Sequence, residues 1–187
     1  MKFNKTVQVM QELGSVVVKK ARNKLKNAKP YSHTTKPNTL YKDIDYVVTS
    51  TKNTVEIDWF FGSADDYWEF VDQGVKGSGG FTGSGKMRGG KTKFRFKKQN
   101  IAKGVVAKWI ANKPLRLRGA DGKFVEKNQQ NIKSAAFLIG RAIAQRGLTR
   151  TLFFTEPYDK EAMKYEDRIV QAFADDLEIE LEQNIKD

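Results

Sequence analysis

The sequence predicts an α+β fold, in which a small antiparallel sheet is packed by long N- and C-terminal helices and a long glycine-rich loop interrupts the middle. Apolar residues recur at helical spacing in residues 6–28 and again in residues 157–184. Residues 54–61 instead alternate between apolar and polar, which is typical of a half-buried strand. Residues 76–90 hold seven glycines and no acid. A chain of 187 residues suits a single domain. We therefore expect one domain over 1–187, with an extended basic loop at about 75–92.

The first part of the chain predicts a helix followed by a β-hairpin. The helix over residues 6–28 has one apolar face and a basic remainder, and Pro30 ends it. Residues 45–51 and 54–61 are expected to pair as two strands across a Thr-Lys-Asn turn. Val55, Ile57 and Trp59 should share the buried face of the second strand, since alternate residues point to the same side.

The middle of the chain predicts short elements. Residues 63–74 read as a short helix that Ser63 caps and Gly74 ends. The segment TKFRFKK, residues 92–98, alternates like a strand, and residues 100–111 have helical spacing up to Pro114. A second hairpin is expected around Asp121-Gly122.

The last part of the chain predicts two helices joined by a short apolar segment. A helix is expected over residues 128–146, with Gly147 as its stop. The segment TLFF reads as a connector or a strand. The final helix, residues 157–184, is acidic. Its predicted buried stripe contains Met163, Ile169 or Val170, Phe173, Leu177 and Leu181.

Charge is strongly segregated along a chain whose formal net charge is +12. Residues 73–120 contain thirteen Lys or Arg and no acid, whereas residues 156–187 contain eleven acids and four bases. Such separation favours anionic partners or head-to-tail contact between copies of the protein.

The segment GKMRGGKT, residues 85–92, matches the phosphate-loop pattern G-x-x-x-x-G-K-[ST]. A phosphate loop needs a buried strand before it and a helix starting at its lysine. Here GSGGFTGS precedes the segment, and the period of two in TKFRFKK follows it. No apolar strand ending in Asp lies downstream to complete a metal site. We therefore interpret the segment as a cationic loop and not as a nucleotide site.

Other catalytic constellations are missing from the sequence. One histidine and no cysteine exclude most nucleophilic triads and zinc sites. The pairs Asp65-Asp66 and Asp175-Asp176 are sequence neighbours, which do not face each other on a helix. No signal-peptide run or membrane span is expected. We predict a protein that is not an enzyme, with no cofactor, metal or small-molecule substrate.

Two charged surfaces are the candidate binding sites. The basic one is a loop and strand that contact a neighbouring subunit or DNA phosphate, with Phe94 and Phe96 on the opposite, inward face. Its residues are Lys76, Lys86, Arg88, Lys91, Lys93, Arg95, Lys97 and Lys98. The acidic one is an interface on the last helix, formed by Asp175, Asp176, Glu178, Glu180 and Glu182.

Three short motifs carry a resemblance to a known family. A Leu-x-x-x-Ile entry into the hairpin lies at Leu40–Ile44, the segment YWEFVDQG at residues 67–74, and FLIGRAIAQRGLTRTLFFTEP at residues 137–157. Together with the N-terminal amphipathic helix and the glycine-rich loop, this order resembles the head–tail joining and tail-completion proteins of tailed bacteriophages.

The resemblance implies a non-enzymatic virion protein, assembled in the host cytoplasm. It would be a subunit of a homo-oligomeric ring around the DNA channel, as a neck ring, a tail terminator or a ring of a short tail. Its partners would be its own copies, adjacent portal, neck or tail ring proteins, and viral DNA in the channel. Complementary basic and acidic ends suit a head-to-tail contact that closes by rotation. A non-specific nucleic-acid-binding protein is the alternative that the charge leaves open.

Overall fold

The computed structural model describes residues 3–28, 39–79, 92–97, 101, 103–112 and 115–186, and its class is α+β, as predicted. Where the length suggested one domain, the chain falls into two compact units. The terminal unit combines Met1–Asp72 with Thr151–Asp187, and the central unit is Gln73–Arg150.

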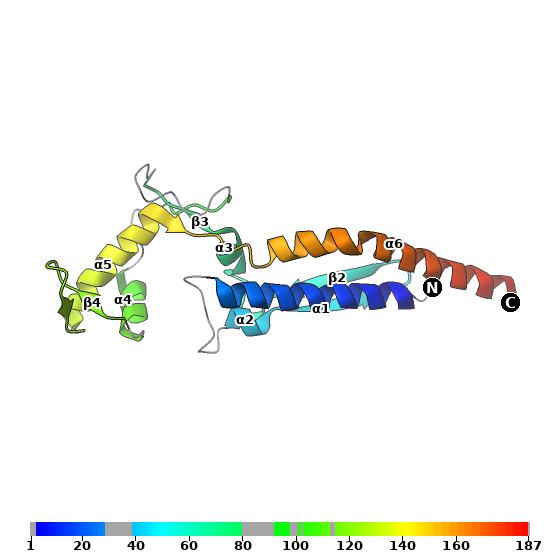
Figure 1. Ribbon diagram of the computed structural model, residues 1–187, viewed down its shortest axis with the longest axis horizontal. Helices are drawn as coiled ribbons and strands as arrows, with labels where there is room; N and C mark the ends of the chain where they lie inside the picture. Colours follow the sequence, from blue (N-terminus) through cyan, green and yellow to red (C-terminus); the bar gives the residue numbers. More distant parts are fainter. Residues whose placement is uncertain are drawn as a thin grey trace. The chain divides into compact units, whose positions relative to one another are not determined.

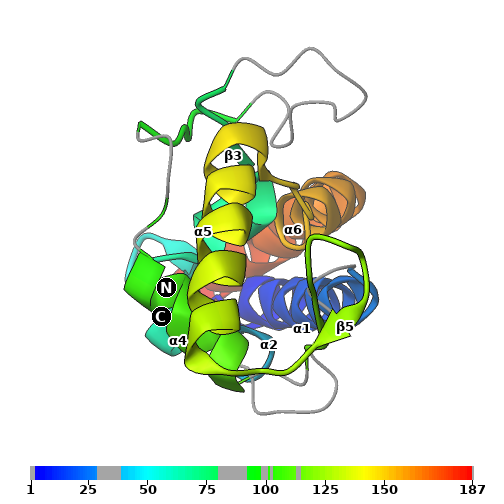
Figure 2. The same ribbon diagram turned by 90° about the vertical axis from the view of Figure 1, so that its left-hand side faces the viewer.

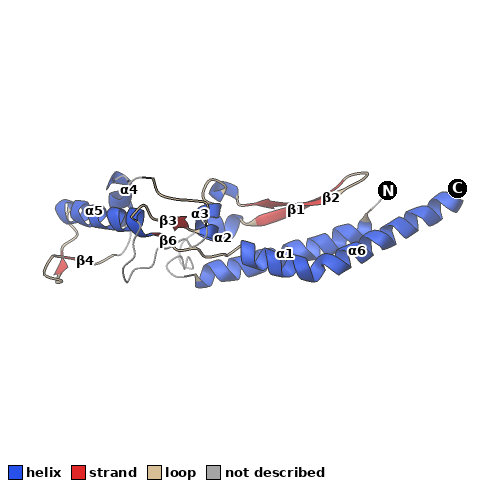
Figure 3. Cartoon of the chain, turned by 90° about the horizontal axis from the view of Figure 1, so that it is seen from above, coloured by secondary structure: helices blue, strands red, loops and turns tan. Residues whose placement is uncertain are grey.

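The terminal unit is built on two long helices that run antiparallel and side by side (Figures 1 and 3). They are α1 (Asn4–Asn27) and α6 (Thr155–Lys186), which confirms the predicted terminal helices. Between them in sequence lie α2 (Thr39–Asp43), β1 (Asp45–Ser50), β2 (Val55–Phe60), a 3-10 turn (Gly62–Ala64) and α3 (Trp68–Gln73). The single helix expected over residues 63–74 is therefore a 3-10 turn followed by a short α-helix.

The predicted first hairpin is present, and its alternation is as expected. Strands β1 and β2 pair antiparallel, with Tyr46 opposite Trp59 and Val48 opposite Ile57. These four side chains are partly buried, whereas their sequence neighbours point to solvent. The hairpin lies close against α1 at Gly14, where a Cβ atom would come within 2.3 Å of the Tyr46 ring. Only glycine leaves space for that ring.

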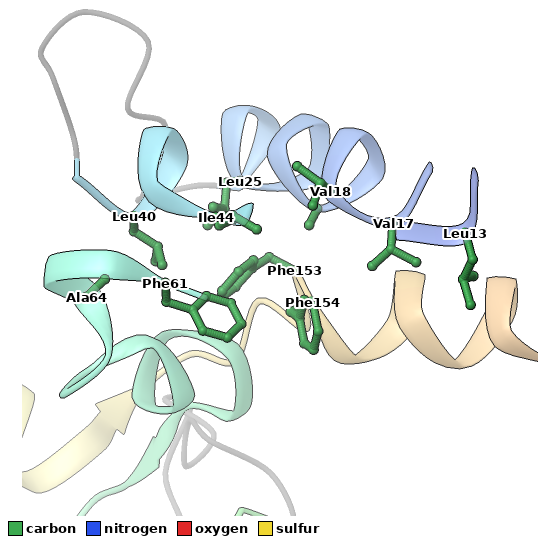
Figure 4. Close-up of a cluster of buried hydrophobic side chains, with 11 residues drawn as sticks. Leu13, Val17, Val18, Leu25, Leu40, Ile44, Phe61, Ala64, Phe153 and Phe154 are labelled. Carbon is green, nitrogen blue, oxygen red and sulfur yellow. The ribbon is translucent and has the colours of Figure 1, made fainter. Parts of the chain in front are cut away.

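An aromatic core joins the hairpin to both long helices (Figure 4). Phe61 stacks on Trp68 at 4.0 Å between ring centroids and meets Phe153 and Phe154 edge-on. The TLFF segment is thus a connector whose two phenylalanines are buried in this core, beside Val17 and other apolar residues of α1. Stacked and edge-on aromatic pairs add to the stabilisation from buried area.

The central unit packs α4 (Lys103–Asn112) beside α5 (Gln129–Arg146), as Figure 2 shows. Asn128 caps α5, because its side chain accepts a hydrogen bond from the Asn131 N–H. Strands β4 (Leu117–Arg118) and β5 (Phe124–Val125) form the hairpin expected around Asp121-Gly122. Gly147 ends α5 as predicted, with φ of 85°.

Of the strand expected at residues 92–98, the described part, residues 92–97, forms a single bridge. Strand β3 (Val75–Lys76) pairs antiparallel with β6 (Gly147–Leu148), and Lys76 forms one parallel bridge with Arg95. The Lys76 N–H donates to the Phe94 carbonyl, and its carbonyl accepts from the Phe96 N–H, both at 2.9 Å. A two-residue partner strand gives this segment no further backbone groups to pair with, so the ladder ends there.

Candidate assembly surfaces

Ion pairs along the whole length of α1 hold α1 and α6 in one register. Lys5 pairs with Asp175 at 2.9 Å, and Lys20 pairs with Glu161 at 2.7 Å. Arg168 pairs with Glu12 at 2.6 Å, and Lys24 pairs with Glu156. Single exposed ion pairs contribute little stability. A shift of α6 by one turn would break all of them together, so the set specifies the antiparallel register.

Asp176 of α6 caps the N-terminus of α1. Its carboxylate accepts hydrogen bonds from the Lys5 N–H (3.1 Å), the Thr6 N–H (2.9 Å) and the Thr6 hydroxyl (2.8 Å). Phe3, at the N-cap position, supplies no such acceptor. Burial alone would raise the pKa of Asp176, but the hydrogen bonds from Thr6 and Lys5 outweigh it and lower that pKa. The first backbone donors of α1 are therefore satisfied by a residue 170 positions away.

The five residues of the predicted acidic interface fall into two groups. Asp175 and Asp176 contact α1 of the same chain, and Asp176 is only 2% exposed, so it is not available to a partner. Helix α6 continues past the N-terminus of α1 (Figures 1 and 3). Glu178, Glu180 and Glu182 follow Asp176, which contacts that N-terminus, along α6. The interface role predicted for Asp175 and Asp176 is thus replaced by a structural one.

Most of the predicted buried stripe of α6 faces solvent, although Ile169, the alternative to Val170, packs on the core and the Phe173 ring stacks on Phe3. Met163 is 77% exposed, Val170 64% and Leu181 61%, and Phe173 and Leu177 are exposed as well. Helix α1 instead packs on the opposite face, which carries Glu161, Tyr165, Ile169, Ala172 and Asp176. The helical spacing of this face is as regular as that of the predicted stripe. Apolar periodicity does not predict that this face is buried, because two of its five residues are the acids Glu161 and Asp176.

The exposed apolar residues follow the outer side of α6, with the acid Asp167 between Met163 and Val170. At 3.6 residues per turn these apolar residues fall within about 40° of one line, over roughly 33 Å of helix. We call this set the outer stripe, and it consists of Met163, Val170, Ala174, Leu177, Leu181 and Ile185. No other described part of the terminal unit packs on it. Exposed apolar surface of this extent marks interaction sites.

The predicted basic surface is described in part. Lys93, Arg95 and Lys97 are exposed, whereas Phe94 and Phe96 between them are half-buried, which confirms the predicted alternation. Lys76 is bridged to Arg95 at the edge of this surface. The Lys93 ammonium lies 5.0 Å from the centroid of the Phe94 ring. Lys86, Arg88, Lys91 and Lys98, with the GKMRGGK part of the phosphate-loop match, lie outside the described residues.

The central unit also has a groove between its two helices that the sequence did not indicate. We call it the α4–α5 groove, and it has a volume of about 670 Å³. Its lining includes Gly104, Ala107, Lys133, Ser134, Phe137 and Leu138. A Cβ atom at Gly104 would meet nothing within 4 Å, so the groove is open at that point. Lys108 and Arg141 are exposed on the same two helices.

Within the described ranges, no group of three or more His, Asp or Glu side chains is arranged to hold a metal ion. Nor does any helix in those ranges combine the length and apolar character that a bilayer span requires. Comparison with known proteins found no matching family model, curated protein or solved structure.

We expect acid to loosen the α1–α6 pair. Hydrogen bonds from Lys160 and Lys24 lower the pKa of Glu156 from 4.5 to about 2. A carboxyl group with a depressed pKa contributes stability above its unfolded pKa and loses it as the pH falls through the folded value. The urea concentration at the unfolding midpoint of the wild-type protein should therefore decrease as the pH is lowered from about 4.5 to about 2.

The matched comparison is Glu156→Gln against Glu166→Gln, since Glu166 is an exposed acid of the same helix and forms no ion pair within the described chain. Glu156→Gln should lower the midpoint at pH 7 and flatten its decline in acid. Glu166→Gln should leave the profile of wild type unchanged. Equal profiles for wild type and Glu156→Gln would contradict the role given to this ion pair.

Proposed function

We propose that this chain is a non-enzymatic structural subunit of a homo-oligomeric ring in the neck or tail of a tailed bacteriophage. The ring would join the portal or head to the tail around the DNA channel, in a virion assembled in the host cytoplasm. The observation that carries the proposal is the outer stripe of α6. It is an apolar helix face about 33 Å long that α1 leaves uncovered, on a helix already fixed in register by ion pairs and an end cap.

The order of sequence features supports the same proposal. An amphipathic first helix, the YWEFVDQG segment and the FLIGRAIAQRGLTRTLFFTEP segment resemble the head–tail joining and tail-completion proteins. Two of these segments meet in the terminal unit, where the Asp72 carboxylate accepts hydrogen bonds from Phe154 and Thr155. A terminal unit with an uncovered apolar helix face suits a subunit that is completed by its neighbours.

The distribution of charge favours a second candidate, a non-specific nucleic-acid-binding protein. Residues 73–150 hold nineteen Lys or Arg and two acids. Exposed Lys93, Arg95 and Lys97 lie on one side of their segment. Lysine and arginine in such numbers bind phosphate without reading sequence, and the binding weakens steeply with salt. In the ring proposal the same charge faces DNA in the channel or an acidic neighbouring subunit.

Particle mass separates the two candidates. Purified protein should form closed particles whose mass is a fixed multiple of the 21.3 kDa subunit, visible as rings by electron microscopy. Antibodies should also detect the protein at the portal end of purified virions. A protein that stays monomeric, is absent from virions and binds DNA with a steep salt dependence would instead be the nucleic-acid-binding candidate.

A further inference from the structure

We propose that the outer stripe of α6 in one copy docks in the α4–α5 groove of a second copy, so that each subunit is both donor and acceptor. The inference rests on the proposed function, because it names the contact that would close the ring. A contact between two different surfaces repeats from copy to copy and forms a ring when the rotation closes.

Both surfaces are largely apolar. The outer stripe presents the side chains of Val170, Leu177 and Leu181 in a line along one helix face. The groove lies between two helices and has Ala107, Phe137 and Leu138 in its lining. A third helix laid along such a groove buries apolar surface on three sides, which is the usual way in which helices recognise grooves. Gly104 contributes no side chain to the lining, so a helix can approach the groove closely at that point.

The charges beside the two surfaces are complementary. Glu166, Asp167 and Glu178 lie beside the outer stripe, are exposed, and form no ion pair with any described residue. Lys108, Lys133 and Arg141 lie in or beside the groove, and they too form no ion pair within the described ranges. Opposite potentials speed encounter and specify which surfaces meet.

The same charges disfavour the other contact open to the stripe, which is packing against α6 of a second copy. Residues 156–187 carry eleven acids and four bases. An antiparallel pair of these helices would bring acidic flanks together, since Glu166, Asp167 and Glu178 border the stripe along its length. The α4–α5 groove lies in the basic central unit, where the acidic flanks of the stripe meet no such repulsion. The groove is therefore the favoured binding surface for the outer stripe.

Two variants test the docking by particle mass. Leu181→Lys places a charge in the outer stripe, and Gly104→Trp fills the groove from a position with open space around it. Each should weaken self-association at least ~100-fold and leave monomers, as expected when one central apolar contact of an interface is lost. Unchanged far-ultraviolet circular dichroism would show that the subunit remains folded.

Each of the two variants has a matched control that changes the same helix or the same residue without blocking the proposed contact. Ile179 is also exposed, at 43%, but it lies about 200° around the helix from Leu181. Ile179→Lys should therefore leave the particle intact, although it adds the same charge to the same helix. Gly104→Ala leaves the groove open and should give particles of the same mass as wild type.

Cross-linking identifies the contact directly, because the natural chain has no cysteine. One preparation carries Leu177→Cys, a second carries Ala107→Cys with a tag of different mass, and the two are mixed with a short thiol-reactive cross-linker. We expect a mixed dimer of both masses, and none when Ile179→Cys replaces Leu177→Cys.

The outcomes distinguish the docking from the ring. Dimers of Leu177→Cys alone would show stripe-to-stripe packing and overturn the docking. Wild-type rings that persist in Leu181→Lys and Gly104→Trp, without the mixed cross-link, would also overturn it and leave the ring standing. Mixed cross-links in open chains that never close would support the docking and refute the ring. A wild-type protein that is monomeric and gives no mixed cross-link would refute both.

Discussion

Replacement of Asp72 by alanine is expected to destabilise the terminal unit by about 3 kcal/mol or more. Asp72 is fully buried. Its carboxylate accepts from the Phe154 N–H (2.8 Å), the Thr155 N–H (3.2 Å) and the Thr155 hydroxyl (2.5 Å), at the start of α6. Its backbone carbonyl also accepts from the Thr151 and Leu152 N–H groups. Alanine would keep the backbone bonds but leave the first donors of α6 buried without a partner.

The measurement is the free energy of unfolding in urea, followed by tryptophan fluorescence, because Trp59 and Trp68 both pack in this unit. Asp66→Ala is the matched control, since Asp66 is an exposed acid nearby with no hydrogen bond among the described residues. It should change the free energy by less than about 0.5 kcal/mol. Equal effects of the two substitutions would show that Asp72 does not cap α6.

Replacement of Gly147 by alanine is expected to destabilise the central unit more than the same replacement of Gly122 or Gly104. Gly147 has φ of 85°, which costs other L-residues about 1–2 kcal/mol. An added Cβ would also lie 2.1 Å from the Val75 carbonyl oxygen, in the β3–β6 pairing. The strand must move away to relieve that contact, so we expect a loss of at least ~3 kcal/mol.

Alanine substitutions at two other glycines of the central unit distinguish the cost of a positive φ from the cost of a steric clash. Gly122 has a similar φ of 78° but no atom within 4 Å of an added Cβ, so Gly122→Ala should cost only the backbone term of about 1–2 kcal/mol. Gly104 has open space and no positive φ, so Gly104→Ala should stabilise α4 by about 0.5–1 kcal/mol. Hydrogen exchange of the α5 amides would compare the stability of the three variants. If these amides exchanged no faster in Gly147→Ala than in Gly122→Ala, the proposed clash with the Val75 carbonyl would be contradicted.

Local pattern was enough to predict several elements of this fold. The β1–β2 hairpin followed from its period of two, and α5 followed from its spacing together with Asn128 and Gly147 at its ends. These elements depend on side-chain alternation and end groups that lie within a few residues of one another. The inward placement of Phe94 and Phe96 was predicted in the same way.

Pattern failed where two faces of one helix compete for burial. On α6, apolar spacing selected Met163 and Leu181 for the core, yet α1 packs on the face that carries Glu161 and Asp176. These two acids are buried because α1 supplies partners for them, Lys20 for Glu161 and the helix N-terminus for Asp176, and Lys164 of α6 also pairs with Glu161. The partners on α1 are more than 140 positions away, so no window of local sequence contains them.

The sequence by itself determined the α+β class, the two terminal helices and the separation of charge. Each of these follows from composition or from neighbours within one or two turns. Only the tertiary structure decided which face of α6 is covered, that Asp176 and Asp72 cap helices far away in the chain, and that the apolar stripe of α6 is left exposed. The physical reason is that a buried carboxylate or an uncovered apolar face is defined by what packs against it, and that is settled by contacts between distant segments.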